Sequence, residues 1–80
     1  MPLELTWHEN DTGNGEYTML GNLTACFWPD ANAPTEGLGW RVNLLRNNGL
    51  GLDVVRDGRA RNDSAAKALA ASYLRSEWRP

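Results

Sequence analysis

The chain has 80 residues, enough for one domain, and a domain of this size buries only about 60% of the surface that its unfolded form exposes. Its one cysteine, Cys26, excludes an internal disulfide and a site built from several thiolates. The net charge of −2 indicates neither a strongly acidic nor a strongly basic protein, and no apolar run approaches the roughly 18 residues of a membrane span. We therefore expect a single domain over residues 1–80 and, because the N-terminus lacks the basic and apolar regions of a signal peptide, a cytoplasmic location.

The first third of the chain predicts antiparallel strands. Residues 3–8 ("LELTWH") alternate apolar and polar side chains, which is typical of a half-buried strand with Trp7 on its inner side. Residues 16–28 ("EYTMLGNLTACFW") continue this alternation on both sides of Gly21. We favour a bulge or bend at Gly21, although a two-residue hairpin at Gly21-Asn22 also fits. With a bend, one inner side would hold Tyr17, Met19, Leu23, Ala25 and Phe27.

A long connection and a second pair of strands follow. Residues 29–39 ("PDANAPTEGLG") have no periodicity, which predicts a long loop. Residues 40–46 ("WRVNLLR") alternate again, with Trp40 on the inner side, and Asn48-Gly49 is a strong hairpin signal because both residues tolerate a positive φ. Residues 50–55 form the returning strand, and we expect Asp57-Gly58 to end it with a turn.

The C-terminal stretch "RARNDSAAKALAASYLRSEWRP" predicts a helix. Asn62 and Asp63 are good N-caps, and the alanine-rich sequence from residue 65 has high helix propensity. Trp78 lies outside the apolar stripe, so either the helix ends near Ser76 or this ring is exposed. Together these elements predict an α+β fold, an antiparallel sheet of four to five strands with one C-terminal helix packed on one face. The stripe consists of Ala66, Leu69, Ala70, Tyr73 and Leu74.

Charge is distributed unevenly along the chain. Residues 1–40 contain no Lys or Arg and have a charge of −6, whereas residues 41–80 have a charge of +4. We favour a sheet in which strands of both halves interleave, so that the charges mix on the surface. The alternative is a molecule with an acidic side and a basic side, which would steer a charged partner.

Residues suited to catalysis are few. His8 is the only histidine, and the alternation places it on the polar side of its strand. No glycine cluster has the spacing of a phosphate-binding loop, and Glu9, Asp11 and Glu16 match no calcium-loop spacing. We therefore expect a protein that is not an enzyme and that has neither a cofactor nor a metal site.

Binding to another protein is the function that the composition favours. Four tryptophans are many for so small a core, and those outside the predicted core are Trp28, at the start of the long loop, and Trp78. We predict a partner-binding site in the loop at Trp28, Asp30 and Glu36, with Trp78 and Arg79 as a second anchor at the end of the helix.

A nucleic-acid-binding module is the alternative. Residues 58–74 ("GRARNDSAAKALAASYL") resemble the last strand and the alanine-rich helix of double-stranded RNA-binding domains, but the N-terminal helix and the lysine pair of that family are absent. The residues that would contact phosphates form a possible basic strip of Arg56, Arg59, Arg61 and Lys67.

The chain as a whole resembles small phage and prophage proteins of the anti-CRISPR and anti-restriction type. The resemblance rests on the length, the Trp-containing strands, "GLGW" before one strand and "SAAKALAASYL" in the final helix. It implies an inhibitor whose partner is a protein, such as a larger host nucleoprotein complex, blocked by occupying its surface. A structural phage or prophage component is a further alternative.

Overall fold

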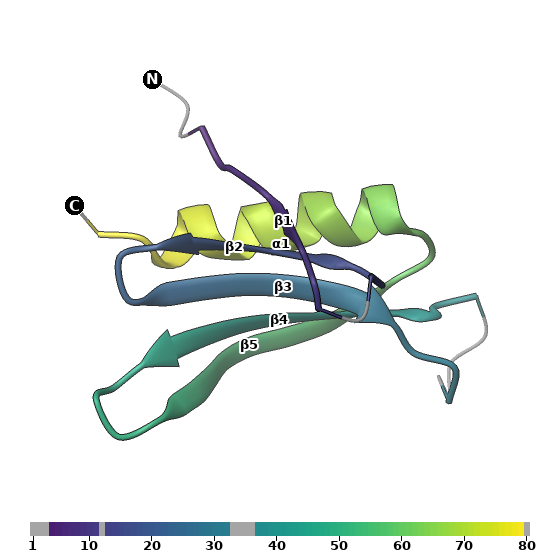
Figure 1. The fold of residues 1–80 in the computed structure, drawn as a ribbon. Coiled ribbons are helices and arrows are strands. Elements are labelled where there is room, and N and C mark those ends of the chain that lie inside the picture. Colours follow the sequence, from purple (N-terminus) through teal and green to yellow (C-terminus); the bar gives the residue numbers. More distant parts are fainter. Residues whose placement is uncertain (1–3, 12, 33–36, 80) are drawn as a thin grey trace.

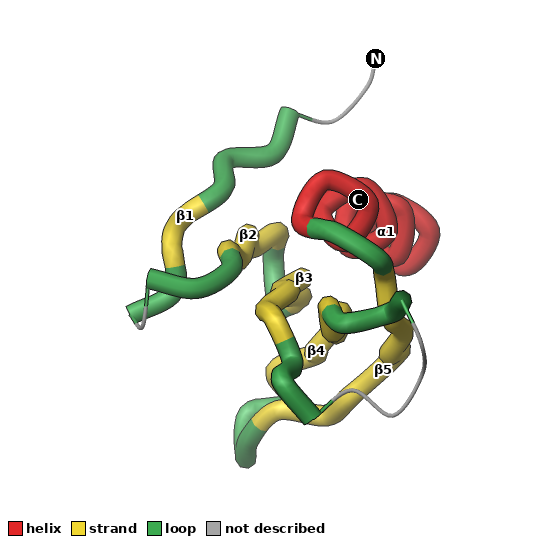
Figure 2. Tube along the Cα trace, turned by 90° about the vertical axis from the view of Figure 1, so that its right-hand side faces the viewer, coloured by secondary structure: helices red, strands yellow, loops and turns green. Residues whose placement is uncertain are grey.

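The computed structural model describes residues 4–11, 13–32 and 37–79. These form one antiparallel sheet in the order β1-β2-β3-β4-β5, and one helix lies along one face of it (Figure 1 and Figure 2). The predicted α+β class, with one C-terminal helix on one face, is confirmed. The elements are β1 (His8–Glu9), β2 (Glu16–Leu20), β3 (Leu23–Pro29), β4 (Trp40–Asn47), β5 (Leu52–Ala60) and α1 (Asp63–Glu77).

The turn between β2 and β3 is a two-residue hairpin, so the bulge or bend that we favoured at Gly21 is wrong. Leu20 pairs with Leu23, and Gly21 has a φ of 61°, a left-handed conformation that glycine adopts without steric cost. Paired residues of a hairpin point to the same face, and here each pair joins an even-numbered residue to an odd-numbered one. Tyr17 and Met19 therefore point away from the face that holds Leu23, contrary to the single inner side that we predicted.

The N-terminal segment is less regular than predicted. Within the described part of the expected strand 3–8, only His8 pairs with β2, where it lies opposite Tyr17. Residues 4–7 instead cross the helix side of the sheet, held by a hydrogen bond of 2.7 Å that the Thr18 hydroxyl donates to the Thr6 carbonyl. The predicted alternation still holds in part, since Trp7 packs against the core.

Strands β4 and β5 form the predicted hairpin, with a loop of residues 48–51. Gly49 has a φ of 88°, and the Asn48 side chain accepts hydrogen bonds from two backbone N–H groups of the loop. The turn that we predicted at Asp57-Gly58 is wrong, because β5 continues to Ala60. A Cβ at Gly58 would overlap the Tyr73 hydroxyl, so this glycine permits close packing of the helix on the strand.

Helix α1 begins and ends as its caps dictate. The Asn62 side chain accepts a hydrogen bond from the Ala65 N–H, as expected of an N-cap, and the chain turns to an extended conformation at Trp78. The inner face has small side chains, since Ala66 and Ala70 are completely buried. None of the described residues belongs to a helix long and apolar enough to cross a lipid bilayer.

The core lies between α1 and the central strands. Phe27 is at its centre, with Trp7 and Trp40 at ring-centroid distances of 5.6 and 6.1 Å, so the predicted inward placement of both tryptophans is confirmed. The cluster of buried residues consists of Leu23, Ala25, Phe27, Val42, Leu44, Ala60, Ala66, Ala70 and Leu74. Four of these are alanines, so the few large side chains supply most of the buried apolar surface.

We expect Leu74→Ala to lower the free energy of unfolding by about 2–4 kcal/mol, because this fully buried side chain would leave a cavity between α1 and the sheet. Ala68→Ser, on the exposed side of the same helix, should change it by less than about 0.5 kcal/mol. Chemical denaturation of both variants measures the difference. Equal effects would contradict the packing of α1 on this face.

Candidate functional site

The sheet has a second face, opposite α1, on which the described residues place no further layer (Figure 2). We call it the open face. Since side chains alternate along a strand, every second residue of β2 to β5 points to it. Strand pairing arranges these side chains in three rows across the sheet: an apolar row (Met19, Thr24, Leu45, Val54), a middle row (His8, Tyr17, Cys26, Asn43, Asp57) and a charged row (Trp28, Arg41, Arg59).

The apolar row is exposed to solvent at its two ends, and Thr24 and Leu45 between them are half-buried. Met19 and Val54, at its two ends, are 62% and 58% exposed, and Leu52, two residues before Val54 on β5, is 60% exposed. Leu50, in the adjoining hairpin loop, is 98% exposed. Single exposed apolar residues are normal, but a group of this kind at one end of a sheet is typical of an interaction surface.

The middle row is mainly polar. His8 and Asp57 at its ends are exposed, and the three residues between them are half-buried. The His8 and Tyr17 rings contact each other at a centroid distance of 5.4 Å. Burial raises the pKa of the Cys26 thiol, and a hydrogen bond with the Asn43 backbone opposes this shift only in part. The thiol therefore stays protonated at neutral pH, which suits a packing residue rather than a nucleophile.

The charged row contains the predicted anchor Trp28, which is half-buried beside its strand partner Arg41. Arg59 forms an ion pair of 3.0 Å with Asp30, in which both side chains are only 20% exposed. Arg41 lies 3.6 Å from Asp57 in a more exposed pair. Two predicted site residues, Trp28 and Asp30, are thus at the same end of the open face, whereas Glu36 lies outside the described residues.

Two contacts lower the pKa of Asp30. The larger contribution is the hydrogen bond of 3.0 Å from the Asn32 backbone N–H, and the second is the hydrogen bond from the Arg59 guanidinium. Both favour the ionised carboxylate, so folding and ionisation of Asp30 support each other.

The lowered pKa predicts a pH dependence of stability. The contribution of the Asp30 carboxylate is fully present above its unfolded pKa of about 3.9 and is lost as the pH falls through the lower folded value. We expect Asp30→Asn to be less stable than the natural chain at pH 6, with a difference that shrinks toward pH 2. Urea unfolding at several pH values in this range measures the difference. If the free energy of unfolding fell equally for both chains as the pH is lowered, the link between Asp30 ionisation and stability would be refuted.

The second predicted anchor, Trp78 and Arg79, lies elsewhere. Trp78 follows α1 on the helix side of the sheet, where its half-buried ring packs against the core and covers Gly21. Because Gly21 precedes β3 and Trp28 is near its end, the two tryptophans are at opposite ends of the strand and on opposite faces. They do not form one binding surface.

A double-mutant cycle tests the placement of Trp78. Gly21→Ala should cost about 1–2 kcal/mol of stability, because of its positive φ and because a Cβ would lie 2.7 Å from the Trp78 ring. In a Trp78→Ala background this cost should fall by about 0.5 kcal/mol or more, since only the backbone strain remains.

Gly49→Ala is the matched control for this cycle. Gly49 also has a positive φ, but nothing lies within 4 Å of a Cβ there, so its cost should be the same in both backgrounds. An unchanged cost of Gly21→Ala in the Trp78→Ala background would show that the ring does not cover the turn.

The predicted basic strip does not form. Arg59 points to the open face, whereas Arg56 points to the helix side and contacts Glu77 at 3.1 Å. Lys67, on α1, contacts Glu16 at 3.2 Å, and Arg61 is exposed in the turn before the helix. These cations are therefore on different sides of the molecule, and three of them are paired with carboxylates.

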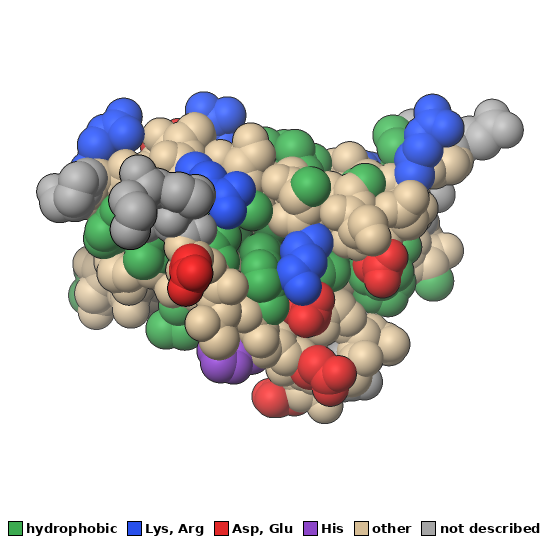
Figure 3. Space-filling view, turned by 90° about the horizontal axis from the view of Figure 1, so that it is seen from above, with side chains coloured by type: hydrophobic (Ala, Val, Ile, Leu, Met, Phe, Trp, Pro, Cys, Tyr) green, Lys and Arg blue, Asp and Glu red, His purple; other side chains and the backbone are tan. Residues whose placement is uncertain are grey.

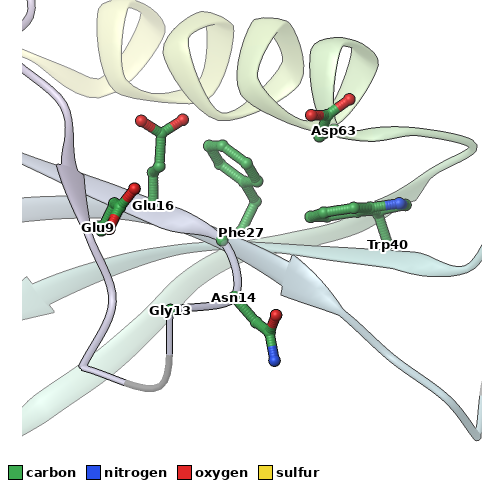
Figure 4. Close-up of a pocket in the computed structure, with 8 residues that line it drawn as sticks. Glu9, Gly13, Asn14, Glu16, Phe27, Trp40 and Asp63 are labelled. Carbon is green, nitrogen blue, oxygen red and sulfur yellow. The ribbon is translucent and has the colours of Figure 1, made fainter.

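A hollow of about 240 Å³ lies at the N-terminal end of α1 (Figure 4). The Phe27 and Trp40 rings line it between the carboxylates of Glu9 and Glu16 on one side and Asp63 on the other. The described residues contain no group of three or more His, Cys, Asp or Glu placed to hold a metal ion.

Charges separate more than we expected. The strands follow chain order in the sheet, so the acidic first half forms β1 to β3 and the basic second half forms β4, β5 and α1. The interleaving that we favoured is wrong. Figure 3 shows acidic side chains mainly in the lower part of the view, near the histidine, and most Lys and Arg in the upper part. Ion pairs such as Lys67–Glu16 join the two halves.

Comparison with known proteins finds no matching family model, no similar curated protein and no similar solved structure. The open face therefore has to be interpreted from its own chemistry. Met19 and Tyr17 were missed as surface residues because we assigned them to the core side. The signal that could have found them is Gly21-Asn22, since a two-residue hairpin reverses the side on which odd-numbered residues lie.

Proposed function

We propose that this chain is a non-catalytic domain that binds another protein on its open face. The observation that supports the proposal is the composition of that face. Tyr, Trp, Met and Arg are the residue types enriched at protein interfaces, and the open face displays Tyr17, Met19, Trp28, Arg41 and Arg59 together.

The arrangement of the rows suggests the chemistry of the partner. The apolar row favours a partner surface with exposed aliphatic or aromatic side chains, which would be removed from water on binding. At the other end of the face, Trp28 offers a large, half-buried ring as an anchoring contact. Because Arg41 and Arg59 are already paired with Asp57 and Asp30, this end offers orientation by hydrogen bonds rather than attraction by net charge.

The resemblance to phage inhibitors gives this proposal a more specific form. A small domain that covers the surface of a larger host nucleoprotein complex could inhibit it without catalysis. The dispersed, paired cations support a protein partner over nucleic acid, whose phosphates attract a continuous basic surface. The exposed position of His8 on β1 and the raised pKa of the Cys26 thiol support a non-catalytic role.

The test compares variants of the open face. Met19→Lys with Val54→Lys places charges at both ends of the apolar row, and Trp28→Ala removes the ring at the other end. Each should weaken the partner complex by about 2 kcal/mol or more, roughly 30-fold in Kd, as expected of interface hot spots. Quantitative affinity capture from cells with an intact antiviral defence system identifies the partner, and titration of that partner measures the Kd.

The matched control is Ala68→Lys with Ser72→Lys, which adds the same charges at exposed positions of α1 and should leave the complex unchanged. Melting temperatures confirm that all variants fold. Equal loss in the control and the open-face variant, or a bound species that nuclease removes at physiological salt, would overturn the proposal.

A further inference from the structure

Strand β5 is a long outer edge of the sheet. It spans Leu52–Ala60 and, among the residues that the structure describes, pairs on one side only, with β4. The outermost strand on the other side, β1, is only His8–Glu9. An edge strand displays backbone N–H and C=O groups that can pair with another strand, and proteins commonly block such edges with Lys, Pro or a bulge. β5 contains neither Lys nor Pro. A register shift opposite Leu44 and Leu45 interrupts it, which leaves residues 56–60 as a regular segment.

Along a strand, the backbone groups of successive residues point alternately to one side and to the other. This alternation shows which backbone groups of residues 56–60 point away from β4. The Asp30 N–H donates to the Gly39 carbonyl at 2.7 Å, and since ladder bonds alternate along antiparallel strands, Trp40 and Val42 direct their backbone groups toward β5. Their partners there, Ala60 and Gly58, use their own groups to pair with β4. The N–H and C=O groups of Asp57 and Arg59 therefore point away from the sheet. The Asp57 carbonyl there accepts a hydrogen bond of 3.3 Å from the Tyr73 hydroxyl, and its second lone pair is the one that a neighbouring strand would use.

Few registers would let a second copy pair with this edge. In a symmetric antiparallel pair, two residues lie opposite each other only if the backbone groups of both point in the same sense, toward or away from the partner strand. The two-fold axis must therefore pass between the same residue of the two copies. An axis at Asp57 would place the two Asp57 carboxylates opposite each other, and an axis at Arg56 or Arg59 would place two guanidinium groups opposite each other. Both arrangements are destabilising. An axis at Gly58 instead places Asp57 opposite Arg59 on both sides of the axis.

We propose that two copies of this chain associate through residues 56–60 of β5, antiparallel and centred on Gly58. Each Asp57–Arg59 pair then exchanges both of its backbone hydrogen bonds, and the opposite charges lie side by side on the open face. Gly58 adds no side chain at the axis. The result is one sheet that continues across both copies, with both helices on the same side and the two open faces joined.

Sedimentation equilibrium of the full chain over a wide concentration range tests the pairing. We expect a reversible dimer. Arg59→Asp, which opposes Asp57 with a second carboxylate, and Asp57→Arg, which opposes Arg59 with a second cation, should each raise the dimer dissociation constant at least tenfold. Two controls should leave it unchanged: Asp30→Asn, which removes the same internal ion pair as Arg59→Asp, and Arg79→Asp, which makes the same charge change at an exposed site.

Mixing the two edge variants distinguishes this register from a general effect of charge. In a mixed pair, the carboxylates at 57 and 59 of the Arg59→Asp copy lie opposite the guanidinium groups at 59 and 57 of the Asp57→Arg copy. Association should therefore return when the two are combined. A natural chain that stays monomeric, controls that dissociate equally, or variants that do not recover on mixing would each overturn the proposal, the first leaving the edge open to a strand of a different protein.

Discussion

The packing of α1 on one face of the sheet is the interaction on which the other features of the molecule depend. Ala66 and Ala70 present no bulk, so the helix backbone lies close to the strands, and Gly58 provides the same freedom on the sheet side below Tyr73. Close packing lets a short helix seal a core of a few large side chains around Phe27. One helix can cover only one face, however, and the opposite face is left in contact with solvent.

What the open face displays follows from the turn at Gly21-Asn22. A two-residue connection pairs even with odd positions, which turns Tyr17 and Met19 outward while Phe27 stays in the core. With a bend in place of this turn, the same side chains would have faced the helix. The surface chemistry of β2 is thus set by a glycine with positive φ rather than by the hydrophobicity of the strand.

Sequence reasoning succeeded at most positions where local physics decides, with the Gly21-Asn22 turn as an exception, and it failed where tertiary contacts decide. The helix, its Asn62 cap and the alternation of β4 depend on neighbouring residues, and all were predictable. Asp57-Gly58 suggested a turn, but Gly58 actually allows Tyr73 to approach the strand closely. That role depends on how α1 packs on the sheet, which the local sequence does not reveal. Trp28 and Asp30 were predicted together and lie at the same end of the open face, but Arg59, which pairs with Asp30, had been assigned to a basic strip because its direction depends on the register of β5.

The order of the strands has a kinetic consequence. Each strand pairs only with its neighbours along the chain, so the sheet can grow by successive hairpins, each of which closes on a timescale of about microseconds. Such local connectivity is associated with fast folding, because little loop entropy is lost before contacts form. During synthesis, however, α1 emerges after all five strands. The apolar side of the growing sheet, including Phe27 and Leu44, must therefore wait for the final residues of the helix before it leaves water, and aggregation competes with folding during this interval.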